Sequence, residues 1–130
     1  MNEVLERDGA HVDAFYYCPH HPEHGIGIYK KKCHCRKPET GMFEMAERDL
    51  TEGIDKMHSY MIGDKRIDAQ AGKNFGVTGV LVGTGYGAKE HAEDMAAGLI
   101  KEDGSCPAGG YDVYADTLLD AVRGILGGRI

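Results

Sequence analysis

Residues 59–68 read Ser59-Tyr60-Met61-Ile62-Gly63-Asp64-Lys65-Arg66-Ile67-Asp68. The first four residues predict a short strand, and Gly63 allows the backbone to turn tightly out of it. Residues 69–75 continue as a predicted helix, which Gly76 ends. This order of strand, turn and helix decides the fold, because it places Asp64 beyond the carboxyl end of a strand, where parallel α/β sheets bind their ligands.

Strand and helix patterns alternate along the rest of the chain. Three further strands are expected, at 12–17, 79–82 and 111–114. Three further helices are expected, at 42–50, 88–100 and 117–126, and the residues of the last helix expected to face inward are Leu118, Leu119, Val122, Ile125 and Leu126. Such alternation is typical of a parallel sheet covered by helices on both faces, so the sequence predicts an α/β fold.

The bulk composition fits one ordinary domain. The chain has 130 residues, of which 42% are hydrophobic, enough for a real core. Its net charge of −6 argues against general binding to nucleic acids or anionic membranes, which requires a basic surface. No apolar stretch approaches the roughly 20 residues that span a bilayer, and no signal-peptide pattern follows Met1. We therefore expect a cytoplasmic protein with reduced thiols.

Cysteine and histidine gather in the segment 18–35. Two Cys-x-ligand pairs are the expected ligands of one metal ion: Cys18, His20, Cys33 and Cys35. Three thiolates and one imidazole suit a closed tetrahedral zinc site, and a reducing compartment favours metal over disulfide bonds. His20 is preferred over His21, His24 and His34 because it makes the x-spaced pair with Cys18. The segment therefore predicts a structural Zn²⁺ that braces a loop.

The second cysteine pair runs directly into two cations, Arg36 and Lys37. Residues 30–37 carry five cations in eight positions of an otherwise acidic protein. Arginine offers a planar fork to phosphate and lysine a compact point charge, while Pro38 restricts the backbone of Lys37. A loop held by metal could present both cations to a phosphorylated substrate. The alternative is a solvated basic loop without a ligand.

Two carboxylates follow the strand at 59–62. Asp64 is expected to point into the ligand crevice, and Asp68 falls in the first turn of the next helix, close enough to help. Carboxylates with ordered water suit Mg²⁺, and Lys65 beside them could meet a phosphate oxygen. The alternative is that both carboxylates only stabilise the amino terminus of the helix.

Together these motifs resemble one known family. C-P-H-H-P at 18–22, C-H-C-R-K-P at 33–38 and M-I-G-D-K at 61–65 are similar to the D-glycero-D-manno-heptose 1,7-bisphosphate 7-phosphatases of the haloacid dehalogenase-like (HAD) superfamily. The resemblance covers nearly the whole chain and is strongest over 12–85. It implies a three-layer Rossmann-like fold and hydrolysis of the C7 phosphate through an aspartyl-phosphate, as a step toward lipopolysaccharide precursors.

The resemblance also implies roles for individual residues. Structural zinc binds at Cys18, His20, Cys33 and Cys35. In the active site, Arg36 recognises the substrate, Lys37 stabilises the phosphoryl group, Asp64 binds catalytic Mg²⁺ and Lys65 contacts the substrate or the metal site. The full-length enzyme is expected to be a monomer whose partner is a phosphorylated sugar.

One family motif is missing from residues 1–130. The D-x-D-G-T sequence that supplies the nucleophile and the general acid/base is absent, and Asp8-Gly9 does not replace it because no apolar strand leads into it. The resemblance therefore implies that the chain is a single partial HAD-like domain, truncated at its amino terminus. Such a fragment is expected to be inactive alone and only marginally stable.

The same residues are compatible with two alternative functions. Within the phosphatases, the runner-up substrate is histidinol phosphate, because a sibling group shares the zinc loop and the R-K-P run. From another class, the chain could be a non-catalytic zinc module that binds an anionic partner such as nucleic acid through 30–37. The acidic net charge and the lack of interleaved aromatic residues argue against that module.

Overall fold

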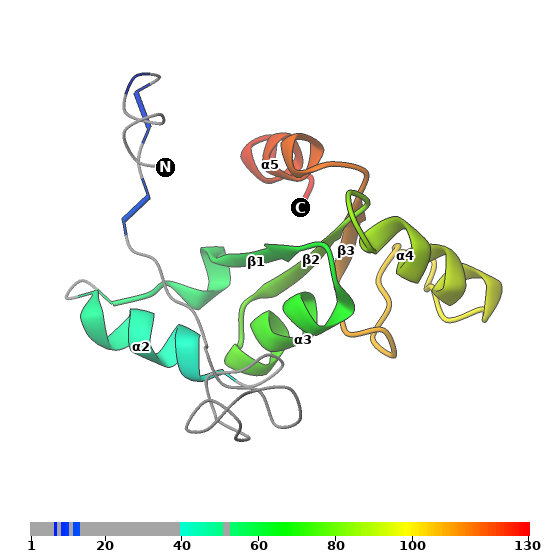
Figure 1. The fold of residues 1–130 in the computed structure, drawn as a ribbon, viewed down its shortest axis with the longest axis horizontal. Coiled ribbons are helices and arrows are strands. Elements are labelled where there is room, and N and C mark those ends of the chain that lie inside the picture. Colours follow the sequence, from blue (N-terminus) through cyan, green and yellow to red (C-terminus); the bar gives the residue numbers. More distant parts are fainter. Residues whose placement is uncertain (1–6, 8, 11, 14–39, 51–52) are drawn as a thin grey trace, which may run out of the picture.

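A computed structural model describes residues 7, 9–10, 12–13, 40–50 and 53–130 of the chain (Figure 1). The elements in chain order are α2 (Gly41–Asp49), the 3₁₀-helix η2 (Lys56–His58), β1 (Tyr60–Gly63), α3 (Arg66–Phe75), β2 (Thr78–Val82), α4 (Gly87–Ala96), β3 (Val113–Ala115) and α5 (Leu118–Leu126). None of the described helices has the length and apolar character needed to cross a bilayer.

The sheet has three parallel strands in the order β1-β2-β3. Ile62 pairs with Val80, and Val80 in turn pairs with Val113 on its other side. Because all three strands run the same way, their carboxyl ends and the loops that follow them meet at one edge of the sheet. This edge carries the candidate site.

The central strand β2 is covered on both faces, as expected for a buried parallel strand. On one face Leu81 packs with Ala69 of α3 and with Tyr111, and all three are fully buried. On the other face lie Val80 and Val82, against Ala121 of α5. Figure 1 shows the result as three layers, with α3 and α5 on opposite faces of the sheet.

Most predicted elements are confirmed, with shifted ends. The strands expected at 59–62 and 79–82 are β1 and β2, and the α/β fold with a parallel sheet is confirmed. Helix α3 begins three residues before the expected Ala69, and α4 ends at Ala96 rather than at 100, just before Gly98, whose φ of +71° is left-handed. Of the strand expected at 12–17, residues 12 and 13 are described and are not part of a strand, and residues 14–17 lie outside the described residues.

The predicted orientation of α5 is wrong. Most of the side chains expected to face inward are exposed: Leu118 by 55%, Leu119 by 57%, Val122 by 37% and Leu126 by 83%. The buried residues of this helix are instead Ala121 and Gly124. Small residues let a helix axis approach a sheet closely, whereas leucines on that face would hold it away. A hydrophobic pattern gives weight to large apolar residues, so it does not reveal a contact made by small residues such as Ala121.

Candidate active site at the carboxyl ends of β1 and β2

Two loops meet at the carboxyl edge of the sheet. Asp64 follows β1, and residues 83–86 follow β2. Gly85 has a φ of +63°, and any side chain at this position would collide with the carboxylate of Asp64. The backbone of the second loop therefore lies directly against Asp64, and the prediction that Asp64 faces a loop crevice is consistent with this packing.

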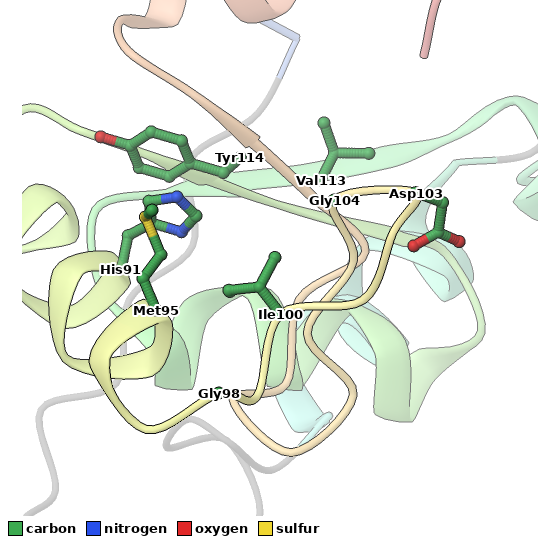
Figure 2. A pocket seen from close by; sticks show the side chains of 8 residues that line it. All are labelled: His91, Met95, Gly98, Ile100, Asp103, Gly104, Val113 and Tyr114. Carbon is green, nitrogen blue, oxygen red and sulfur yellow. The ribbon is translucent and has the colours of Figure 1, made fainter.

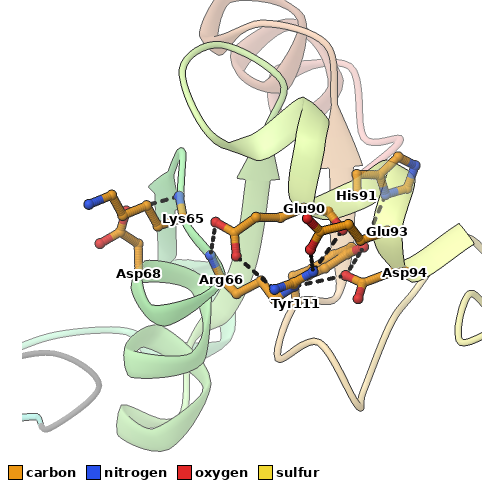
Figure 3. Close-up of polar contacts among 8 residues, drawn as sticks. All are labelled: Lys65, Arg66, Asp68, Glu90, His91, Glu93, Asp94 and Tyr111. Atoms are coloured by element: carbon orange, nitrogen blue, oxygen red, sulfur yellow. Dashed lines mark hydrogen bonds and ion pairs between the residues drawn. The ribbon is translucent and has the colours of Figure 1, made fainter. Parts of the chain in front are cut away.

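Asp68 closes the turn between β1 and α3. Its Oδ2 accepts a hydrogen bond of 3.2 Å from the backbone N–H of Lys65 (Figure 3), and the residue is only 6% exposed. Gly63 has no room for a side chain because the Asp68 side chain lies against it. The helix-start role named as an alternative is therefore present for Asp68, and magnesium binding by Asp68 stays a prediction.

Lys65 points its ammonium group at an aromatic ring. Its Nζ lies 4.7 Å from the ring centroid of Tyr86, the last residue before α4. Among the ion pairs seen within the described residues, none involves Lys65. A cation is thus available at the same edge of the sheet as Asp64.

Arg66 ties α3 to α4. Its guanidinium contacts three carboxylates of α4, those of Glu90 at 3.0 Å, Glu93 at 3.0 Å and Asp94 at 3.1 Å (Figure 3). Burial alone would lower the pKa of Arg66, but hydrogen bonds to Asp94 and Glu93 outweigh it and raise that pKa above its ordinary value. The ion cluster fixes α4 against α3, and with it the two loops that precede these helices.

A buried polar chain continues from this cluster. The hydroxyl of Tyr111 donates to Asp94 Oδ2 at 2.9 Å, and Nδ1 of His91 lies 3.0 Å from the same hydroxyl oxygen. A carboxylate only accepts hydrogen bonds, so the Tyr111 oxygen accepts from His91, which requires a proton on Nδ1 of His91. The ring of His91 is half-buried and stacks on Tyr114 at a centroid distance of 3.7 Å.

The Arg66 cluster was not predicted from the sequence. The available signal was the spacing of Glu90, Glu93 and Asp94, which puts three acids on one helix face. Arg66 stands at least 24 residues away from these acids along the chain. Local patterns identify an acidic helix face but cannot identify a partner at that distance.

The buried hydroxyl of Tyr111 predicts a loss of stability at alkaline pH. Burial raises the pKa of Tyr111 above its ordinary value, and the hydrogen bond to Asp94 raises it further. As the pH rises past about 10, the unfolded chain releases this proton while the folded chain retains it, so the stabilisation is intact below about pH 10 and lost above it. We expect the urea midpoint of the wild type to fall more steeply between pH 9 and 11 than that of Tyr111→Phe.

The matched control for this measurement is Tyr86→Phe, because the Tyr86 side chain is 60% exposed. That variant should follow the wild-type pH slope. Equal slopes for Tyr111→Phe and the wild type would contradict the prediction.

A cavity of about 370 Å³ lies between α4 and β3 (Figure 2). Its walls include the rings of His91 and Tyr114, the side chains of Met95 and Ile100, and the carboxylate of Asp103. Hydrogen bonds from Ser105 lower the pKa of Asp103, so the carboxylate is ionised at neutral pH. Neither lysine nor arginine lines the cavity, which therefore does not suit a phosphate group.

The remaining predicted site residues lie outside the described residues. They are Cys18, His20, Cys33 and Cys35 for zinc, and Arg36 and Lys37 for the substrate. Within the part of the chain that the structure describes, no three His, Cys, Asp or Glu side chains form a metal-binding group. The zinc site and the cationic loop accordingly stay predictions.

Sequence comparisons relate this chain to known proteins. A model of the HAD-hydrolase-like family matches residues 34–103. A relative from Vibrio cholerae is 49% identical over 90 residues, covering 68% of this chain and 47% of the relative, and one from Haemophilus ducreyi is 48% identical over 98 residues, covering 74% and 52%. Both are named D-glycero-beta-D-manno-heptose-1,7-bisphosphate 7-phosphatase.

A relative from Burkholderia mallei carries the name of the alpha-anomer enzyme and is 44% identical over 82 residues, covering 63% of this chain and 42% of the relative. The chain thus spans about half the length of the curated relatives it matches. Since the family match extends over more than half of the chain and includes the β1–α3 turn with Asp64 and Lys65, the chain belongs to the HAD-hydrolase-like family.

Proposed function

We propose that this chain is part of a sugar-phosphate phosphatase that hydrolyses the C7 phosphate of D-glycero-D-manno-heptose 1,7-bisphosphate. The observation that carries the proposal is the carboxyl edge of the sheet, where Asp64 lies against the Gly85 backbone and Lys65 offers a cation. Relatives with 41–49% identity bear the name of this enzyme, in beta and alpha forms. The alternative substrate, histidinol phosphate, has no such support.

The residues present at this edge fit a magnesium ion. Asp64 supplies a hard carboxylate oxygen at the edge where the loops after β1 and β2 meet. When bound, Mg²⁺ would neutralise charge on the phosphate oxygens. Asp64 would hold the ion, Lys65 and Lys37 would bind phosphate oxygens, and Arg36 would orient the rest of the substrate.

Residues 1–130 contain no D-x-D-G-T motif, and we propose that the attacking carboxylate is supplied by a segment that carries one. In the proposed reaction an aspartate attacks the C7 phosphorus, the bond to the C7 oxygen breaks, and the sugar leaves with a free C7 hydroxyl group; water then hydrolyses the aspartyl-phosphate to free phosphate. We further propose that Cys18, His20, Cys33 and Cys35 hold a structural Zn²⁺ that fixes Arg36 and Lys37, and that the protein acts as a monomer in the cytoplasm.

Asp64→Asn is expected to weaken magnesium binding at least tenfold, since the amide cannot supply the charged oxygen that the ion prefers. The measurement is a titration of the chain with Mg²⁺, followed by NMR shifts of the amides at residues 63–65 and 85. Asp116→Asn is the matched control, because Asp116 is an exposed aspartate just after β3 at the same edge. Equal magnesium affinities of Asp64→Asn and the wild type would refute this assignment.

Catalysis is tested on a form of the protein that includes a D-x-D-G-T segment. Phosphate release from the heptose bisphosphate should exceed release from histidinol phosphate and should be abolished by Asp64→Asn. Residues 1–130 alone should release no phosphate, and turnover by this chain that Asp64→Ala removes would contradict the proposed mechanism.

Elemental analysis of the same protein, purified under reducing conditions, should give one zinc ion per chain. A sample without zinc would refute the proposed structural zinc site.

A further inference from the structure

Three cations around the β1–α3 turn and along α3 have partners of different kinds. Arg66 is surrounded by carboxylates of α4, and Lys73 forms an ion pair with Asp112 at 3.3 Å. Lys65 instead has the face of Tyr86 as its partner, with Nζ 4.7 Å from the ring centroid. The partner of Lys65 is therefore neutral, whereas those of Arg66 and Lys73 are anionic.

The kind of partner decides what the cation can still do. A carboxylate holds an ammonium group by cancelling its charge, which weakens its attraction for a second anion. An aromatic ring attracts the cation through its quadrupole and carries no net charge, so the ammonium keeps its full charge. Lys65 is thus restrained in position while it stays able to bind a phosphate oxygen.

The backbone around Tyr86 explains why the ring stays beside Lys65. On one side Gly85 lies against the carboxylate of Asp64, in a left-handed conformation that admits no side chain there. On the other side Gly87 begins α4, and its Cα faces the carbonyl oxygen of Val82 with no room for a methyl group. The segment is packed on both flanks of Tyr86, while the ring itself is 60% exposed at the rim.

We infer that Tyr86 is a positioning residue: it holds the ammonium of Lys65, without neutralising it, at the edge of the sheet where Asp64 lies, ready for a phosphate oxygen. This inference rests on the proposed function, since it gives Lys65 a phosphorylated ligand. It assigns to the loop after β2 a role that neither the sequence patterns nor the names of the relatives contain.

Three substitutions separate this role from simple packing. Tyr86→Phe keeps an aromatic face, Tyr86→Leu removes it at similar bulk, and Tyr86→Glu supplies a partner that cancels the charge. The probe is inorganic phosphate, titrated into the chain in the presence of Mg²⁺ and followed by NMR. We expect the Tyr86→Phe variant to bind phosphate like the wild type and the Tyr86→Leu variant to bind it about two- to fivefold more weakly. The Tyr86→Glu variant should bind phosphate more weakly than Tyr86→Leu.

The Lys65 side chain gives a second readout that needs no ligand. Its terminal methylene protons should be shifted upfield by the ring in the wild type and in Tyr86→Phe, and this shift should vanish in Tyr86→Leu. Two results would overturn this inference but leave the proposed function standing. One is an unchanged phosphate affinity in Tyr86→Leu, and the other is a Tyr86→Glu variant that binds phosphate as tightly as Tyr86→Leu. A wild-type chain that binds no phosphate at all would overturn the proposed function and this inference together.

Discussion

Replacing Arg66 by methionine is expected to lower the free energy of unfolding by about 2–4 kcal/mol. Methionine keeps most of the length and the apolar stem of arginine but removes the charge. Three carboxylates of α4 then face one another without a cation, and Asp94 among them has a side chain only 6% exposed. Part of the cluster is open to solvent, since the Arg66 side chain is 30% exposed, which keeps the expected loss below that of a fully buried pair.

Urea unfolding followed by circular dichroism at pH 7 measures this loss. The double variant Arg66→Met/Asp94→Asn should recover part of the stability by removing the most buried charge. Wild-type stability in the single variant would show that the cluster does not hold α4 to α3.

Gly87→Ala is expected to lower the free energy of unfolding by about 3 kcal/mol or more, which would unfold a large fraction of a marginally stable protein. A methyl group at Gly87 would overlap the carbonyl oxygen of Val82. Both groups belong to backbone, in a buried strand and at the first residue of α4, so neither can rotate away as a side chain would. Relief requires α4 to move off the sheet, which would also displace the loop that contacts Asp64.

The control for Gly87→Ala is Gly124→Ala in α5. A methyl group there would meet Cδ1 of Ile130 at 2.7 Å, and this atom is the end of a flexible side chain at the last residue of the chain. Alanine also favours a helix over glycine by about 0.5–1 kcal/mol, which offsets the contact. We expect the free energy of unfolding of Gly124→Ala to lie within about 1 kcal/mol of the wild-type value. Similar losses of stability in Gly87→Ala and Gly124→Ala would contradict the clash argument.

The sequence predicted those parts of the fold that local chemistry determines. Residues 79–82 are apolar throughout, and the strand they form is buried on both faces. Gly76 ends α3 as expected, with a φ of +99°. Asp64 was placed correctly after β1, because the strand-glycine-aspartate order is readable within five residues.

What the sequence did not predict depends on distant partners or on small side chains. The contact of Arg66 with α4 and that of Lys65 with Tyr86 join residues 21 or more positions apart, which no local period reveals. The orientation of α5 depends on Ala121 and Gly124, which carry little weight in a hydrophobic pattern. In each case tertiary packing decided a choice that the local sequence left open.

The arrangement around Arg66 also affects how an anion reaches the protein. Three carboxylates against one guanidinium leave two negative charges on the flank of α4. Within a screening length of about 8 Å at physiological ionic strength, this surplus repels an incoming dianion, while Lys65 at the neighbouring edge attracts it. The difference in potential between the two favours the approach of a dianion at Lys65 over its approach along the flank of α4.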